Sequence, residues 1–299
     1  MLGCVTFWQG EFATASAALE KAYSLHRPHA QPENTLALQI DPGVNALLHL
    51  SWVRWILGYP DQAIATSECA IDTARKLAQP FALVMALFWA CATRVCCGHH
   101  AASRRLLDEL QALSARHGLE YFASCARVLE GQYLISQDRC AAGFEQIGRA
   151  LAEFRSQEAG LGIPWALSIS ATGYLRLGKA QEGLAAVSEA LEAAGRNGEH
   201  HWDCELWRLQ GELVLLSSAP DEAEADSCFA SAIELARQQC AKSLELRAAT
   251  SRARLYARRG DAELARQTLA PVLGWFEEGF DTEDIRNATD VLQKIIARP

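Results

Sequence analysis

The chain has 299 residues, half of them hydrophobic, and carries a formal net charge of −8 at pH 7. This hydrophobic content is ample for a continuous core, whereas the surplus of carboxylates disfavours binding to the phosphate backbone of nucleic acids. The longest apolar run, residues 81–92, is too short to cross a bilayer, and no signal-peptide pattern opens the chain. We therefore expect a cytoplasmic protein that binds neither nucleic acid nor membrane.

A repeat of 40 residues organises the chain. Small residues recur at this spacing at Ser51, Cys91, Gly131, Ala171, Gly211 and Ser251. A fixed period of this length is typical of stacked supersecondary units. A small residue at the same point of every unit indicates that two helix backbones approach each other closely there.

Each unit is predicted to be a first helix, a short turn and a second helix. Apolar residues four positions after the small column place a buried stripe on the first helix. The turn residues seven positions after the small column are Gly58, Gly98, Asp138 and Gly178, with shifted turns at residues 218–220 and at Gly260. The second helices carry their own small column at Ala63, Ser103, Gly143, Gly183, Ala225 and Ala265.

In chain order, we predict one repeat domain over residues 1–299. Its units span approximately residues 1–28, 44–80, 81–118, 119–159, 163–198, 200–240 and 242–274, and a capping helix follows at 282–297. The extra residues between the first two units are expected to form a loop within 29–44, where prolines and glycine cluster. The predicted fold is all-α: an α-solenoid that winds as a right-handed superhelix of about seven antiparallel helix pairs.

Three groups of residues suggest chemistry, and each has a plainer explanation. Residues 173–180 almost spell a phosphate-binding loop, but Ala180 lacks the hydroxyl that binds Mg²⁺. A possible zinc set, without the usual ligand spacing, comprises Cys91, Cys96, Cys97, His99 and His100. A polar group around His200 and His201 shows no catalytic pattern. We therefore predict no catalytic residue, no metal site, no cofactor and no enzyme activity, and we expect the ten cysteines to be free thiols.

Two columns of the first helices vary in chemistry while the core columns stay uniform. One column holds Asn45, Met85, Cys125, Trp165, Glu205 and Glu245, and the other holds Trp52, Ala92, Gln132, Thr172, Glu212 and Arg252. Varied side chains on a repeated scaffold are what a recognition surface needs. Apart from Cys125 and Ala92, these are the predicted partner-binding residues of a concave groove, aromatic in its N-terminal half and acidic further on. Packing between repeats is the alternative explanation.

The order of small residue, turn glycine and second small column is similar to a tetratricopeptide repeat (TPR), elongated from the usual 34 residues. Several longer strings resemble a narrower group, the C-terminal repeat region of bacterial proteins that fuse a class III nucleotide cyclase to a predicted ATPase. These strings are residues 7–12 (FWQGEF), 39–44 (QIDPGV), 57–63 (LGYPDQA), 241–249 (AKSLELRAA) and 275–282 (WFEEGFDT). The cyclase and ATPase parts of such proteins are not in this sequence.

Two hypotheses of function follow. The first is a non-catalytic interaction module that binds a protein or peptide partner in its groove. The resemblance implies that the partner is a cyclase, an ATPase or a transcription regulator and that the module is a sensor arm. The alternative is a receptor for a small effector molecule, which would bind in the concave groove or at the loop within 29–44. Residues 41–43 are then expected to be a rigid turn at one wall of the site.

Overall fold

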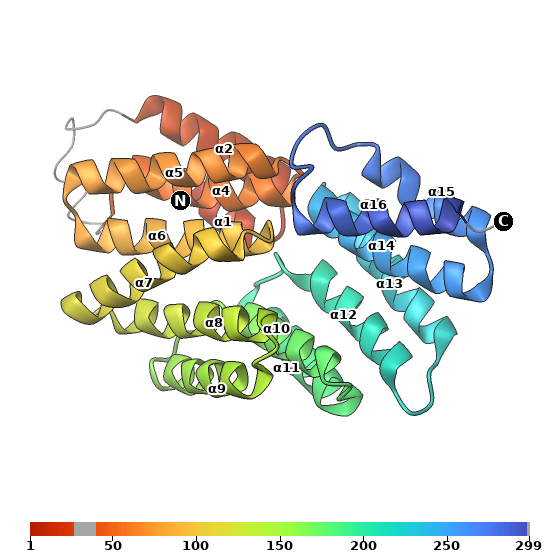
Figure 1. Cartoon of the computed structure of the whole chain (residues 1–299). Helices are drawn as coiled ribbons and strands as arrows, with labels where there is room; N and C mark the ends of the chain where they lie inside the picture. Colours follow the sequence, from red (N-terminus) through yellow and green to blue (C-terminus); the bar gives the residue numbers. More distant parts are fainter. Residues whose placement is uncertain (27–39, 298–299) are drawn as a thin grey trace. The chain divides into compact units, whose positions relative to one another are not determined.

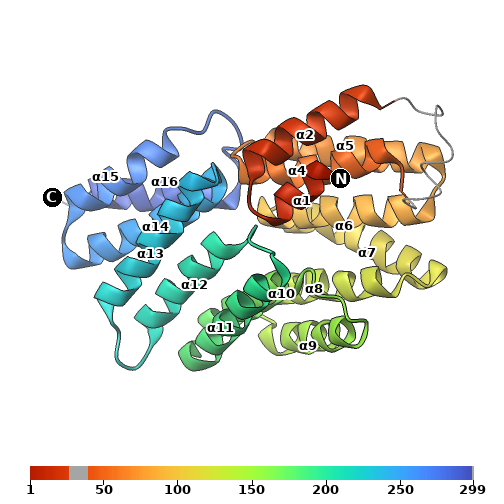
Figure 2. The same cartoon turned by 180° about the vertical axis from the view of Figure 1, so that it is seen from behind.

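The computed structural model describes residues 1–26 and 40–297, and every regular element in these ranges is a helix (Figures 1 and 2). The helices are α1 (Leu2–Trp8), α2 (Phe12–Leu25), α4 (Pro42–Ile56), α5 (Pro60–Leu77), α6 (Pro80–Cys96), α7 (His100–His117), α8 (Glu120–Ser136), α9 (Cys140–Ser156), α10 (Ile163–Arg176), α11 (Ala180–Asn197), α12 (Asp203–Leu216), α13 (Glu222–Gln238), α14 (Lys242–Arg259), α15 (Ala262–Leu273) and α16 (Glu283–Ile296). Within the described ranges, no helix combines the length and the apolar character that crossing a bilayer requires.

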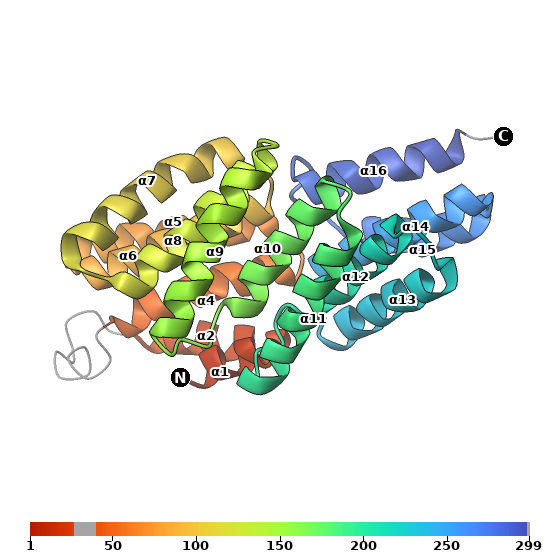
Figure 3. The same cartoon turned by 90° about the horizontal axis from the view of Figure 1, so that it is seen from below.

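Contacts group the chain into two compact units. The N-terminal unit comprises Met1–Trp55 and Tyr59–Ala159, and the C-terminal unit comprises Ile56–Gly58 and Gly160–Pro299. Within each unit a first helix packs on the second helix before it and on its own second helix, as α6 packs on α5 and α7, and α12 on α11 and α13 (Figure 3). First helices also pack on the next first helix, as α12 does on α14. This is the predicted all-α helical repeat of TPR type.

The small columns are buried where helices cross, as predicted. All six residues of the first-helix column and all six of the second-helix column are buried. The closest crossing joins α8 and α9. A Cβ atom added to Gly131 would lie 2.9 Å from the carbonyl oxygen of Gly143, and one added to Gly143 would lie 2.8 Å from that of Gly131. Only glycine allows the two backbones to approach so closely.

The turns inside the helix pairs adopt the left-handed conformation that the sequence predicts. The φ angles are +98° at Gly58, +80° at Gly98, +58° at Asp138, +71° at Gly178 and +87° at Gly260. A second left-handed series lies between the pairs. It was hard to predict from the sequence because three of its members are not glycine. These residues are Ala78, Gly118, Glu158, Gly198 and Cys240.

Most of the loop predicted at 29–44 cannot be compared, because residues 27–39 lie outside the described residues. At its C-terminal end the prediction is wrong, since residues 42–44 are helical. Helix α4 begins at Pro42, a residue favoured in the first helical turn. The Oδ1 atom of Asp41 accepts hydrogen bonds from the backbone N–H groups of Gly43 (2.9 Å) and Val44 (3.0 Å). Asp41 therefore caps a helix, and residues 41–43 are not the rigid turn that the effector-receptor alternative used as a wall.

The C-terminal helix closes the stack as expected. α16 packs on α14 and α15 and buries Ile285, Ala288 and Ile295 on one face, while Arg286 and Asp290 on the other face are exposed. One apolar and one polar face is what the terminal element of a helical repeat requires.

Candidate functional site

Three helices of the C-terminal unit bring a connected set of polar side chains together. We call it the α12–α14–α16 network. Its members are Glu205, Arg208 and Glu212 on α12, Arg247, Ser251 and Arg254 on α14, and Asp284 and Asn287 on α16. On each helix, neighbouring members of the network are three or four residues apart in the sequence. Residues at this spacing lie on the same face of a helix. α14 packs on both α12 and α16 (Figure 1).

Glu205 and Arg208 form the centre of the network. The Nη2 and Nε atoms of Arg208 donate to the two carboxylate oxygens of Glu205 at 2.7 and 2.9 Å. Burial by itself would raise the pKa of Glu205, but Arg208 and Arg247 hold that pKa below its ordinary value. Glu205 is only 6 % exposed. This two-point ion pair fixes both side chains, because the guanidinium fork matches the carboxylate.

The network continues from α12 to α14 and α16. Ser251 donates its hydroxyl hydrogen to Glu212 over 2.6 Å, and Arg247 Nε lies 2.8 Å from the Oδ2 atom of Asp284. Burial raises the pKa of Asp284 in spite of Arg247. The polar chain therefore ties the first helices to the capping helix.

Arg254 differs from the other two arginines of the network. Its Nη2 atom donates to the amide oxygen of Asn287, a neutral group, and it forms no ion pair within the part of the chain that the structure describes. Burial lowers the pKa of its guanidinium, and the nearby Arg208 and Arg258 act in the same direction, against Glu212. A half-buried cation with a neutral partner is able to bind an incoming anion.

Among the predicted partner-binding residues of the N-terminal unit, Trp52 is buried and the other three are half-buried. Trp52 is 3 % exposed, and its ring lies edge-on to Trp89 with centroids 5.3 Å apart. Asn45 and Met85 are half-buried, and the amide of Asn45 donates to the Cys4 sulfur over 3.4 Å. In this unit, Trp52 is therefore a core residue, which favours the packing alternative at its position.

Gln132 on α8 is also half-buried. Its Oε1 atom is buried and accepts no hydrogen bond from the described residues. An unsatisfied buried acceptor of this kind costs free energy.

The predicted residues of the C-terminal unit divide into three groups. Trp165 is 5 % exposed and Thr172 is half-buried on α10. The structure brings Glu205 and Glu212 together in the α12–α14–α16 network.

The other two predicted residues pair with side chains of the second helix α13, and Glu245 pairs in addition with the first residue of its own helix α14. Glu245 binds Arg237 and Lys242 at 2.8 and 2.7 Å, and Arg252 binds Asp226 at 2.8 Å. The predicted acidic groove is therefore wrong as a description of charge, because arginines and lysines neutralise these carboxylates.

The groups considered for metal or catalysis are accounted for by packing. Cys91 is buried and its sulfur contacts the carbonyl oxygen of Ser103, and burial raises its pKa to about 12. No group of three or more His, Cys, Asp or Glu side chains that could hold a metal ion occurs among the described residues. His200 pairs with Asp203 at 2.8 Å.

Beside that pair, Glu199 is wholly buried and accepts the Gly162 N–H at 3.1 Å with each carboxylate oxygen. Burial raises the pKa of Glu199 to about 8 and lowers that of His201 to about 3. Both groups are therefore neutral in the folded protein near pH 7. Glu199 links the turn before α12 to the turn before α10 through its hydrogen bonds from Gly162.

Sequence reasoning missed most of the network. Arg208, Ser251, Arg254, Asp284 and Asn287 lie outside the two variable columns. One signal was available: Arg247 interrupts an otherwise largely apolar column that holds Leu47, Leu87 and Leu167. A charge in a core column indicates a paired, buried polar group.

Comparisons with known proteins support the fold. No protein-family model and no curated protein sequence matches the chain. Among solved structures, the apo form of RapI is 10 % identical, with a TM-score of 0.58, and the match covers 99 % of this chain and 97 % of that chain. The Rap conjugation gene regulator of the plasmid pLS20 in complex with the Phr* peptide is 13 % identical (TM-score 0.69; 97 % and 74 % covered).

A Rap protein complexed with competence and sporulation factor is 15 % identical, with a TM-score of 0.65, and the match covers 99 % of this chain and 74 % of that chain. At these identities the likeness defines the class of fold alone. The chain has the TPR-like all-helical repeat fold of these structures.

Proposed function

We propose that the chain is a non-catalytic regulatory module that binds an extended peptide or protein segment along its first helices. The observation that carries the proposal is the α12–α14–α16 network, in which Arg254 has only a neutral partner. Two proteins of the same fold, at low identity, are described in complex with the Phr* peptide and with competence and sporulation factor. A shared fold does not imply a shared function, and the geometry of the network is therefore the main support for the proposal.

The chemistry of the network suits a peptide with an acidic group. Arg254 would bind a carboxylate of the peptide, because a charge-assisted hydrogen bond to a carboxylate is about twice as strong as its present bond to an amide. The half-buried Glu212 is able to accept an N–H group of the peptide backbone. Its ion pair with Arg208 and its hydrogen bond from Ser251 fix this acceptor in advance, which lowers the entropy cost of binding.

The wider setting of this module is part of the same proposal. The strings at residues 57–63 and 241–249 resemble the repeat region of cyclase–ATPase fusion proteins. On that basis the module would act in the cytoplasm as the sensor or regulatory arm of a cyclase or ATPase signalling system. A transcription regulator is the other partner that the resemblance suggests.

A selection of peptides on the intact chain tests the proposal. A random peptide library displayed on phage is enriched on the immobilised chain, and the recovered peptides are synthesised and measured by calorimetry. We expect a consensus with an acidic residue and a loss of affinity of about tenfold in Arg254→Gln, in the range that alanine scans find for central interface residues.

Arg286→Gln is the matched control, since Arg286 is an exposed arginine on the far face of α16. It removes the same charge and is expected to leave the affinity unchanged. Equal binding by wild type, Arg254→Gln and Arg286→Gln would contradict the assignment of the site to the network.

A further inference from the structure

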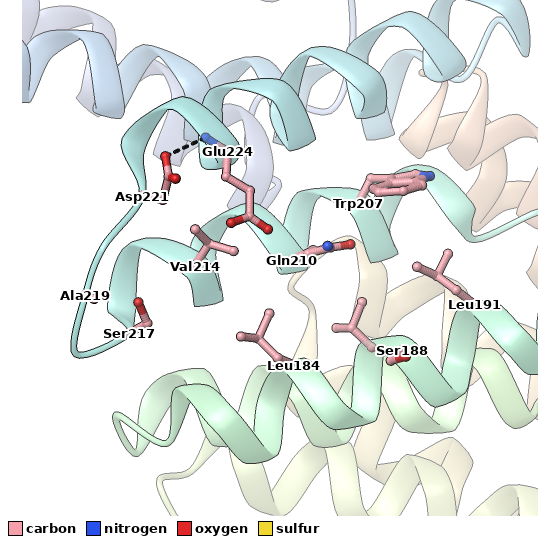
Figure 4. A pocket seen from close by; sticks show the side chains of 11 residues that line it. Leu184, Ser188, Leu191, Trp207, Gln210, Val214, Ser217, Ala219, Asp221 and Glu224 are labelled. Atoms are coloured by element: carbon pink, nitrogen blue, oxygen red, sulfur yellow. Dashed lines mark hydrogen bonds between the residues drawn. The ribbon is translucent and has the colours of Figure 1, made fainter.

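A pocket of about 450 Å³ lies in the C-terminal unit, outside the α12–α14–α16 network. Its walls are the successive second helices α11 and α13, and its floor is the first helix α12 between them (Figure 4). A volume of this size is within the range of small-molecule sites. The pocket has the proportions for a compact ligand.

The repeat shows why this space is open. Val214 on α12 occupies the column of Arg94, three repeats earlier, and Ser188 on α11 occupies the column of Glu68. In the N-terminal unit, Arg94 Nη2 lies 2.7 Å from Glu68 Oε1 and bridges the first helix to the preceding second helix. The corresponding side chains in the pocket are short and uncharged.

A second ion pair is lost at the same place. Leu184 on α11 occupies the column of Arg104, two repeats earlier, and Gln210 on α12 occupies that of Glu130. Arg104 Nη1 and Glu130 Oε2 are 2.5 Å apart in the N-terminal unit. Leu184, Ser188, Gln210 and Val214 all line the pocket. The α5–α6 and α7–α8 interfaces each hold one of these ion pairs, whereas the α11–α12 interface holds neither.

The two ends of the pocket differ in chemistry. Trp207 and Leu191 lie at one end, where they offer an aromatic and a branched apolar surface (Figure 4). Trp207 is half-buried, and it also packs against the core cluster of this unit. The turn that the sequence places at residues 218–220 forms the other end.

That other end is acidic. It carries Asp221, and Glu224 points toward the pocket from the first turn of α13 (Figure 4). The Oδ1 atom of Asp221 accepts the N–H groups of Ala223 and Glu224, each at 2.9 Å. Glu224 has no ion pair with any residue in the described ranges.

We infer that this pocket binds a small organic cation, an amine or guanidine carried on an apolar and preferably aromatic body. The apolar body would be removed from water between Leu184, Leu191 and the Trp207 ring, which stabilises the complex through burial of apolar area. The cationic group would lie beside Glu224 and Asp221.

Calorimetry with three indoles of similar size tests the inference on the intact chain. The probes are tryptamine, which is cationic, tryptophol, which is neutral, and indole-3-propionate, which is anionic. We expect tryptamine to bind with a Kd on the order of 1 mM or below, as its small size allows, and tryptophol to bind about threefold to tenfold more weakly. Absence of tryptamine binding, or equal binding of the neutral or anionic probe, would overturn the inference.

Variants then locate the binding. Leu184→Arg combined with Gln210→Glu rebuilds the Arg104–Glu130 pair inside the pocket, and tryptamine binding is expected to disappear while helical circular dichroism is retained. If this double variant does not fold, Val214→Arg serves the same purpose because it restores the Arg94 column. Unchanged tryptamine binding in a folded variant would sink the proposal.

Glu224→Gln provides a milder change at an exposed position. It is expected to weaken tryptamine binding about threefold and to leave tryptophol binding unchanged, because an exposed charge pair contributes little. Glu234→Gln is the matched control, since it removes the same charge from an exposed position of α13 outside the pocket. An equal loss in both variants would mean that net charge, and not the pocket, attracts the cation.

Discussion

The space between successive second helices is filled differently in the two units. In the N-terminal unit, Arg94 reaches back to Glu68 on α5, and Arg104 on α7 reaches forward to Glu130 on α8. In the C-terminal unit the same columns around α11 and α12 hold no charged side chain, and a pocket is left. The core columns beneath are equally buried in both places. A helical repeat is therefore able to open a binding site by exchanging surface pairs while its core columns stay small and apolar.

The largest expected difference between the two units is the effect on stability of replacing a glycine at a helix crossing by alanine. Gly143→Ala is expected to lower the free energy of unfolding by about 1–3 kcal/mol, because the new Cβ would collide with a backbone oxygen of α8. Gly183→Ala on α11 would meet only the Leu213 side chain, which can change rotamer. Its cost is expected to be offset by the higher helix propensity of alanine.

Urea denaturation of the two variants measures this difference. If Gly183→Ala were as destabilising as Gly143→Ala, the distinction between a backbone and a side-chain obstacle would be wrong.

The Arg94 pair is expected to contribute less than the glycine crossing. Arg94→Met should cost about 1–2 kcal/mol, since Arg94 is 8 % exposed and donates to both Ser67 and Glu68. The reciprocal change, Val214→Arg, is expected to cost about 1 kcal/mol, because Val214 is 6 % exposed and packs in a core cluster with Phe229 and Leu255. Thermal and urea unfolding check both, and a gain of stability in Val214→Arg would show that the pocket accepts a guanidinium without disturbing this cluster.

The turn at Glu199 is expected to make stability depend on pH. The equivalent turn two repeats earlier has the uncharged Leu119 at this position and should have no such effect. The folded pKa of Glu199, about 8, lies above its ordinary value of 4.5. The folded protein therefore retains a proton that the unfolded chain has released, and stability falls as the pH rises from 4.5 toward 8. His201, with a folded pKa of about 3, acts in the opposite sense, but only below pH 6.5.

In the wild type, the free energy of unfolding is expected to fall by up to about 1.4 kcal/mol per pH unit between pH 6.5 and 8 because of Glu199. Glu199→Gln should abolish this dependence. The measurement is the unfolding free energy of wild type and variant at several pH values in this window. A constant difference between the two proteins would mean that Glu199 titrates normally.

The smallest expected effect concerns the acidic end of the pocket. Asp221→Ala removes the cap of α13 and should cost about 0.5–1 kcal/mol, whereas Asp221→Asn keeps the cap and should be almost neutral. Both changes remove the negative charge beside the pocket, so both should weaken tryptamine binding. Thermal unfolding and calorimetry of the two variants separate the capping role from the charge.

Much of the fold could be predicted because each helix crossing and each turn inside a helix pair requires a particular residue type, which recurs with the period of the repeat. Small residues such as Gly131 and Gly211 indicated where helices cross, and Gly58 and Gly178 indicated the turns. Left-handed turns at Ala78 and Glu158 were not predictable in this way, since packing of the flanking helices imposes a conformation that these residues rarely adopt.

The candidate site was predictable only in part. Glu205 and Glu212 were identified because their columns vary, but their neutralisation by Arg208 and Arg247 was not, since long side chains select a partner only after the helices are placed. Arg252 illustrates the difference, as it shares a column with Glu212 and yet pairs with Asp226 on α13.

The amino-acid sequence by itself determined the class of fold, the position of most turns and the capping helix, because spacing along a helix fixes which residues share a face. The tertiary structure decided which variable residues are core, as at Trp52, which charges are paired, and where an interface without such ion pairs leaves a pocket. These outcomes depend on distances between helices, which the register of one helix does not specify. The scaffold is therefore encoded locally, and its binding surfaces arise only when the repeats are stacked.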